Sequence, residues 1–154
     1  MVRFRRLSDF QYDPPVHPGH NIVPATIPNG TLLYHDTNRK ELPLGPEWAA
    51  LDPEHAYNFC GDNSAALGYS QQGCFHLTLA ARRPLKVVYF DGKSAAKLPN
   101  GPLDTQDLLA WGELRPENMW NEVLRIHDLC TWGEKFGVDG FVRQVLTSSD
   151  VFVC

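Results

Sequence analysis

The hydrophobic residues of this chain come in short runs, and prolines or glycines separate most of these runs. Runs such as Thr31–His35 and Leu85–Phe90 are rich in residues that favour β-strands, and turn-forming residues lie beside them. Only the segment after Pro116 repeats apolar residues at the three- and four-residue spacing of an amphipathic helix. Because 154 residues make about one domain, the pattern predicts a single compact α+β domain, with a mixed or antiparallel sheet and a long C-terminal helix.

Strands are expected at 31–35, 74–79, 85–90, 141–146 and 151–153, where 74–79 and 85–90 are either one bent strand or a pair. A short helix should begin at Pro53, with Asp52 as its N-cap, and run to about Cys60. A second short helix is expected at 105–111. The long helix should start near Pro116 and end at Phe136–Gly137, with an apolar face formed by Met119, Trp120, Val123, Leu124, His127 and Cys130.

Five prolines in the first thirty residues prevent a continuous helix there. Residues 1–29 are therefore predicted to be an extended arm packed on the domain, and residues 30–154 to be the domain itself. The turn signal Pro28-Asn29-Gly30 marks the boundary between them.

The net charge of −4 arises from 14 basic and 18 acidic residues, so no broad basic surface for nucleic acid or an anionic membrane is expected. No apolar run approaches the ~20 residues needed to span a bilayer, and the N-terminus lacks the apolar centre of a signal peptide. These features predict a soluble, cytoplasmic protein that acts on a small molecule, with its oligomeric state left open.

Four cysteines are scattered without a Cys-x-x-Cys pair, which favours buried or idle thiols over a zinc site or a disulfide scaffold. His17 and His20 are three residues apart, but no third ligand has a suitable local spacing. No metal site is expected.

The common catalytic signatures are missing: the chain has no G-x-G-x-x-G, P-loop, G-x-S-x-G or H-E-x-x-H motif. Histidines near carboxylates remain as candidates. His35 is expected where a strand gives way to a loop, either as a site residue or in a structural hydrogen bond. His76 is either a core or surface histidine or a site residue, and His55 lies in a first helical turn, where a histidine is usually solvated.

The segment Asp104-Thr105-Gln106-Asp107 gathers two carboxylates, a hydroxyl and an amide. Such a group is typical of a helix N-terminus, where side-chain oxygens cap free amides. Alternatively, Asp104, Gln106 or Asp107 contacts a ligand or acts as a general base, since a carboxylate beside Trp111 and Trp120 would be partly desolvated.

The segment Thr31 to Thr37, with His35 near its end, resembles the first motif of ADP-ribosyltransferase-like folds of the histidine-tyrosine-glutamate class. The resemblance implies an NAD-consuming enzyme, a glycohydrolase or an ADP-ribosyltransferase, with NAD as substrate and no other cofactor. His35 would then contact the adenosine ribose, Tyr57 would stack on the nicotinamide, and His55 would contact the same pocket. The catalytic glutamate of that class has no counterpart here, and Asp150 is the acid nearest its place.

A closer resemblance, from Pro28 to Arg143, is to a family of uncharacterised fungal proteins. The matching blocks are Thr31–Asp36, Pro46–Asp52, Arg83–Lys97, Asp104–Leu109 and Phe136–Arg143. This resemblance is specific in sequence and implies no activity.

Two further hypotheses stand beside the NAD-consuming enzyme. The first is a cofactor-independent isomerase, cyclase or hydrolase of a small apolar metabolite, with Asp104, Asp107 or His35 as acid or base. Its pocket would be aromatic, formed by Trp48, Trp111, Trp120 and Phe75. The second is a non-catalytic interaction domain.

Overall fold

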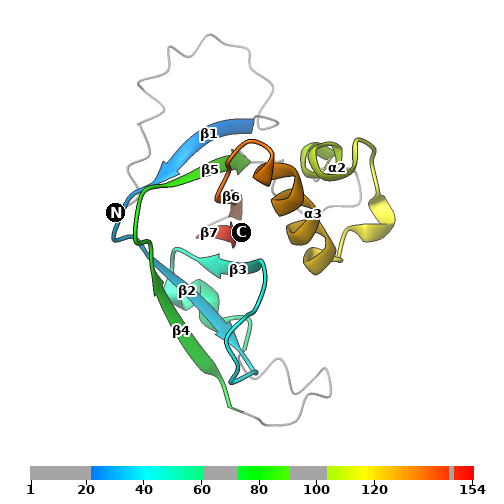
Figure 1. The fold of residues 1–154 in the computed structure, drawn as a ribbon. Helices are drawn as coiled ribbons and strands as arrows, with labels where there is room; N and C mark the ends of the chain where they lie inside the picture. Colours follow the sequence, from blue (N-terminus) through cyan, green and yellow to red (C-terminus); the bar gives the residue numbers. More distant parts are fainter. Residues whose placement is uncertain (1–21, 61–72, 91–103, 146–147) are drawn as a thin grey trace, which may run out of the picture.

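Seven strands form one sheet in the order β1-β5-β6-β7-β3-β2-β4, in a computed structural model that describes residues 22–60, 73–90, 104–145 and 148–154 (Figure 1). The strands are β1 Ile22–Ile27, β2 Leu32–Thr37, β3 Glu47–Ala50, β4 Phe75–Ala80, β5 Leu85–Phe90, β6 Gly140–Val145 and β7 Ser148–Val153. The helices are α1 Pro53–Tyr57, α2 Asp104–Trp111, the 3₁₀ turn η4 Pro116–Asn118 and α3 Glu122–Glu134. β5 and β6 are parallel and the other pairs antiparallel, so the predicted α+β class with a mixed sheet is confirmed.

The sheet curls back on itself at two short connections. Residues 28–31 join β1 to β2, and residues 81–84 join β4 to β5, although each pair of strands is far apart in the sheet order. The two connections bond to each other, since Gly30 N–H donates to the Ala81 carbonyl (2.8 Å) and Ala81 N–H to the Thr31 carbonyl (2.9 Å). Figure 1 shows β1 with β5, and β2 with β4, diverging from this corner. Gly30 has φ +80°, which suits glycine.

The curl brings six strands together around one apolar core. Its buried members are Ile27, Leu33, Ala49, Ala81, Val87, Val142 and Val151. A second core lies on the other face of the sheet, where α3 packs with α2 at its side (Figure 1). Its buried members are Val88, Phe90, Ile126, Leu129, Cys130, Phe141 and Phe152, with Trp48 packed against them.

Strand boundaries differ from the predictions at two places that matter for the site. β2 continues to Thr37, so His35 lies inside a strand and is only 5% exposed, not at the start of a loop as predicted. β7 begins at Ser148, so Asp150 belongs to a strand that was predicted to begin only at Val151. The runs 74–79 and 85–90 are a pair of strands with different neighbours. Part of the predicted arm, residues 22–27, pairs with β5 as an edge strand.

Both predicted short helices form, although α1 ends at Tyr57 and not near Cys60, and Asp52 Oδ1 caps α1 by accepting from Glu54 N–H at 2.8 Å. The predicted apolar face of the long helix is wrong at three positions and right at Cys130, which is buried. Trp120 and Val123 are 73% and 82% exposed, and the His127 side chain is 68% exposed. The buried face of α3 consists of Arg125, Ile126, Leu129, Cys130 and Gly133. The spacing of hydrophobic residues predicted the wrong face because Arg125, a charged residue in an ion pair with Asp107, is the first buried residue of α3.

The prediction of idle thiols is also wrong. Cys60 bonds to Cys74, and Cys130 bonds to Cys154, so the described residues contain no free cysteine. The two cysteines of each disulfide are 14 and 24 positions apart in the chain, which explains why the absence of a Cys-x-x-Cys pair was misleading. Among the described helices, none is long and apolar enough to cross a bilayer.

Candidate functional site

A histidine, an aspartate and an arginine from three elements meet beneath helix α1. His55 Nε2 lies 2.8 Å from Asp150 Oδ1, and Arg143 donates from Nε (3.0 Å) and Nη2 (2.9 Å) to Asp150 Oδ2. Asp150 and Arg143 face each other across the β6–β7 pair, which places both side chains on the same face. The Asp150 side chain is 5% exposed and the His55 side chain 17%. Both oxygens of a buried carboxylate are thus paired, while the imidazole reaches the surface.

A series of ring contacts leads from this histidine through Phe59 and Trp48 to His35. His55 contacts Phe59 edge to face at 5.4 Å between ring centroids, Phe59 contacts Trp48 at 4.2 Å, and Trp48 contacts His35 at 5.0 Å. His35 Nδ1 is buried and has no hydrogen-bond partner among the described residues. The sequence candidates His35, Trp48 and His55 therefore belong to one cluster. Asp150 joins this cluster through its contact with His55.

A chain of ion pairs leads from this cluster to helix α2. Arg143 Nη1 lies 3.0 Å from Glu122 Oε2, and Arg125 Nη1 lies 3.4 Å from the other Glu122 oxygen. Arg125 Nη2 donates to Asp107 Oδ1 at 3.0 Å, and Asp107 Oδ2 accepts from Arg115 N–H at 3.0 Å. Asp107 thus holds the side chain of the buried Arg125 and the backbone at Arg115, in the segment that follows α2. Both of its oxygens are engaged, so its contacts are those of a structural ion pair.

The remaining candidates on α2 and α3 lie apart from the histidine cluster. Trp111 Nε1 donates to Asp128 Oδ2 at 2.7 Å and packs under Arg125 and Arg115. Burial pushes the pKa of Asp128 upward, but hydrogen bonds from His127 and Trp111 outweigh it, so this pKa lies below its ordinary value. Gln106 is fully buried, and Trp120 is exposed. The Asp104 side chain lies outside the described part of the chain.

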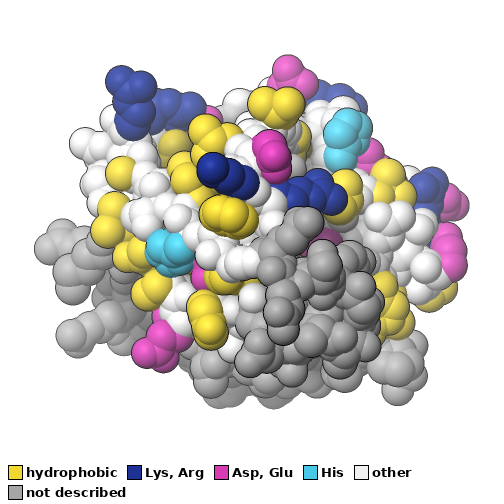
Figure 2. Space-filling view, turned by 90° about the horizontal axis from the view of Figure 1, so that it is seen from below, with side chains coloured by type: hydrophobic (Ala, Val, Ile, Leu, Met, Phe, Trp, Pro, Cys, Tyr) yellow, Lys and Arg dark blue, Asp and Glu magenta, His cyan; other side chains and the backbone are white. Residues whose placement is uncertain are grey.

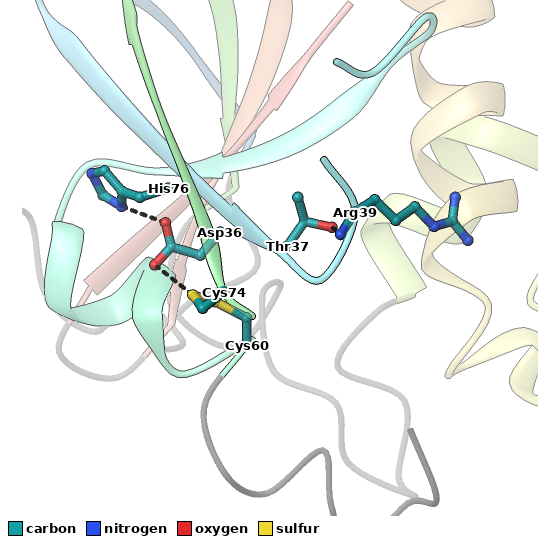
Figure 3. Close-up of a disulfide and its surroundings, with 6 residues drawn as sticks. All are labelled: Asp36, Thr37, Arg39, Cys60, Cys74 and His76. Atoms are coloured by element: carbon teal, nitrogen blue, oxygen red, sulfur yellow. Dashed lines mark hydrogen bonds and ion pairs between the residues drawn. A yellow bond between two sulfur atoms is a disulfide. The ribbon is translucent and has the colours of Figure 1, made fainter. Parts of the chain in front are cut away.

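A second cluster lies beside the first one, because Asp36 follows His35 directly in β2. The Asp36 carboxylate, 1% exposed, contacts His76 Nδ1 with one oxygen, and its other oxygen lies 4.0 Å from Cys74 Sγ (Figure 3). Cys74 forms the disulfide with Cys60. His76 also stacks on Tyr34 at 5.6 Å. His76 is thus a half-exposed strand residue paired with a buried acid.

Beside this second cluster the surface is hollowed. The hollow is lined by Asn38, Arg39, Lys40, Glu41, Gly73 and Phe75. The chain turns here because Thr37 Oγ1 accepts from Arg39 N–H at 3.2 Å, and the Arg39 side chain points away from the disulfide (Figure 3). Phe75, predicted for an aromatic pocket with tryptophans, lines this hollow. Figure 2 shows a face on which acidic and basic side chains are interspersed with hydrophobic ones.

Sequence reasoning identified His35, His55 and Asp150 but not the residues that join them. Phe59 and Arg143 were not selected, because neither forms a local motif with a histidine. Asp150 is 95 positions from His55 in the chain, and only the strand register places Arg143 opposite it. Tyr57, the predicted stacking residue, is 60% exposed on α1 and has no ring contact with the cluster in the described structure.

The fold and the comparisons with known proteins together define the class of this protein. This is an α+β domain with a curled mixed sheet, and residues 10–75 and 61–154 match the family described as the YPL277C N-terminal domain, to which the chain belongs. It is similar to two proteins of Saccharomyces cerevisiae, uncharacterized protein YOR389W and uncharacterized protein YPL277C. Each is 30% identical over 90% of the chain. The predicted fungal family resemblance is confirmed.

The chain spans only 28% of the length of YOR389W and 36% of that of YPL277C. No solved structure matches the chain. The resemblance to ADP-ribosyltransferase-like folds and the cytoplasmic location therefore stay predictions.

Proposed function

We propose that this domain carries an acid–base centre in which His55 transfers a proton to or from a small, largely apolar substrate. The single observation that carries the proposal is the pairing of His55 Nε2 with the buried Asp150. A carboxylate only accepts hydrogen bonds, so the neutral imidazole donates from Nε2 and keeps Nδ1 as a proton acceptor. Arg143 holds Asp150 from the opposite side, and a carboxylate that orients an imidazole in this way is a recurrent arrangement in catalysis.

The aromatic rings indicate what such a centre would bind. Phe59 is 54% exposed although it packs on both Trp48 and His55. A flat, apolar substrate would bury the exposed part of this ring and bring a reacting atom near His55.

The test is turnover of a panel of aryl esters, lactones and aromatic carbon acids, followed by chromogenic release or by solvent-deuterium exchange. The wild-type chain should act on at least one compound, and His55→Gln should reduce that rate by about 10²-fold or more. His127→Gln is the matched control, since His127 pairs with an aspartate but is exposed on α3. Equal rates in wild type and His55→Gln, or no turnover of any compound, would reject the proposal.

A second candidate is cleavage of NAD, which the resemblance to ADP-ribosyltransferase-like folds implies. The observation that favours it is the hollow just after β2, where Arg39 and Lys40 offer two cationic side chains for a diphosphate. In this alternative His35 and Tyr57 retain the roles that the resemblance implies. Calorimetric titration with NAD should give saturable binding that Arg39→Gln with Lys40→Gln weakens. No heat at millimolar NAD would exclude it.

A further inference from the structure

The second cluster combines two cysteine sulfurs and a buried carboxylate at a spacing that suits a metal ion. Ligand atoms of Asp36, Cys60 and Cys74 all lie within 4.8 Å of one another. Thiolate and carboxylate are both zinc ligands, and their bonds to zinc are about 2.0–2.3 Å long, so two ligand atoms of one tetrahedral ion lie roughly 3–4 Å apart. The sulfurs are joined in the oxidised chain, and small side-chain rotations would separate them after reduction.

The Asp36 carboxylate supplies an independent argument. Its side chain is 1% exposed, and the described side chains within bonding distance of it are His76 and the sulfur of Cys74. A disulfide sulfur carries no proton to donate, so among the described residues one carboxylate oxygen has no strong donor in the oxidised form. A buried carboxylate normally requires a cation or several hydrogen bonds. A divalent ion at the two sulfurs would neutralise it.

We propose that reduction of the Cys60–Cys74 disulfide converts this cluster into a zinc site, with Asp36, Cys60 and Cys74 as ligands and His76 as the residue that positions Asp36. A dithiol reductant supplies two electrons and two protons: its own sulfurs become a disulfide, the Cys60–Cys74 bond breaks, and two thiols form. Zinc then binds the two thiolates and displaces both protons to solvent. The oxidised chain lacks the two thiolates and does not bind.

Accessibility fits this role. Cys74 lies on the surface at the start of β4, whereas Cys60 is 7% exposed. A reductant can therefore attack the sulfur of Cys74, and the buried Cys60 leaves. His76 contacts the carboxylate and not the sulfurs (Figure 3), which is the usual position of a residue that orients a metal ligand.

Cobalt(II) is the probe, because its bonds to thiolates give charge-transfer absorption whose intensity follows the number of sulfurs. The protein is the double variant Cys130→Ser, Cys154→Ser, in which Cys60 and Cys74 are the only sulfurs of cysteine. After reduction it should bind one cobalt ion, with absorption that zinc abolishes. Before reduction it should show none. No saturable absorption after reduction, or equal absorption before it, would overturn the proposal.

Three variants assign the ligands. Cys74→Ser should remove about half of the absorption per bound ion, and Asp36→Asn should weaken binding at least tenfold with its sulfur absorption retained. His76→Gln should weaken binding about 10- to 100-fold with the absorption per ion unchanged, as expected of a positioning residue. Unchanged affinity in Asp36→Asn would overturn the assignment. If the double variant does not fold, the ¹¹³Cd resonance of the reduced natural chain is compared with that of reduced Cys74→Ser, because reduction also frees Cys130 and Cys154. A two-sulfur resonance that Cys74→Ser removes supports the proposal, and one that Cys74→Ser leaves unchanged overturns it.

Discussion

Arg143 and Asp150 face each other across the β6–β7 pair, and two guanidinium nitrogens lie 2.9 and 3.0 Å from a single carboxylate oxygen. This geometry leaves the other oxygen to His55. It also ties the candidate centre to α3, because the third guanidinium nitrogen of Arg143 pairs with Glu122. The position of the imidazole thus depends on contacts among β6, β7 and α3.

Asp150→Asn should therefore cost stability as well as any activity. The exchange leaves Arg143 buried with less negative charge around it, and breaking one side of a buried pair typically costs about 3 kcal/mol or more. Urea unfolding monitored by tryptophan fluorescence measures the loss. The control is Arg83→Gln, which breaks an ion pair whose arginine side chain is 63% exposed and should cost less than about 1 kcal/mol. An equal cost for both variants would contradict the buried network.

Gly140→Ala tests the close approach of β6 and β7. A Cβ built at Gly140 would lie 2.3 Å from the Phe152 carbonyl oxygen, which belongs to the backbone. The strands must then separate, and overpacking of this kind costs about 1–3 kcal/mol or more. Gly45→Ala is the matched control, since nothing lies within 4 Å of its added Cβ. Thermal unfolding should show a lower midpoint only for Gly140→Ala, and equal midpoints would refute the register.

Asp139 should make stability depend on pH at the acid end. Arg83 donates two hydrogen bonds to its carboxylate, at 2.6 and 2.8 Å, and the pKa of Asp139 lies below its ordinary value chiefly for this reason, although burial opposes it. The contribution is complete above the unfolded pKa of about 3.9 and is lost as the pH falls through the folded pKa.

Asp139→Asn should accordingly remove part of the stability loss below about pH 4 and lower stability at pH 7. Urea midpoints measured across this range test it. Glu134→Gln, at an exposed position of α3, should not change the loss of stability at acid pH. If Asp139→Asn and wild type lose stability equally at acid pH, the Arg83–Asp139 ion pair is not formed in solution.

The Cys130–Cys154 disulfide should stabilise the domain by about 3 kcal/mol, because it closes a loop of 24 residues in the unfolded chain. The test uses the double variant Cys60→Ser, Cys74→Ser, in which only this disulfide remains. A dithiol reductant should lower its unfolding midpoint. The same reductant should have no effect when all four cysteines are serine. If reduction changes neither protein, the disulfide does not form in solution.

Local chemistry explains which elements were predicted well. Asp52, Pro53 and Glu54 together specify a helix start, and α1 begins where they indicate. Pro28-Asn29-Gly30 predicts a turn, and Gly30 adopts a positive φ there. In each case the relevant contacts lie within a few residues, so the amino-acid order contains them.

Long-range pairing explains the failures. Arg125 would be assigned to the surface by its charge, yet it is fully buried because Asp107 and Glu122 compensate that charge. Because Arg125 is on the buried face, the face of α3 differs from the predicted one, and His127 is exposed. The cysteines were misjudged for the same reason, since Cys130 is in α3 and its partner Cys154 follows β7, 24 positions later.

The α+β class, the short helices and the family to which the domain belongs could be predicted from the amino-acid order, because turns, caps and alternating apolar residues act over a few positions. The contact of Asp150 with His55 and the approach of Asp36 to two sulfurs form only in the folded chain. Those contacts depend on the order of the strands and on the curl of the sheet. Both are set by the burial, in common cores, of residues that are distant in the chain.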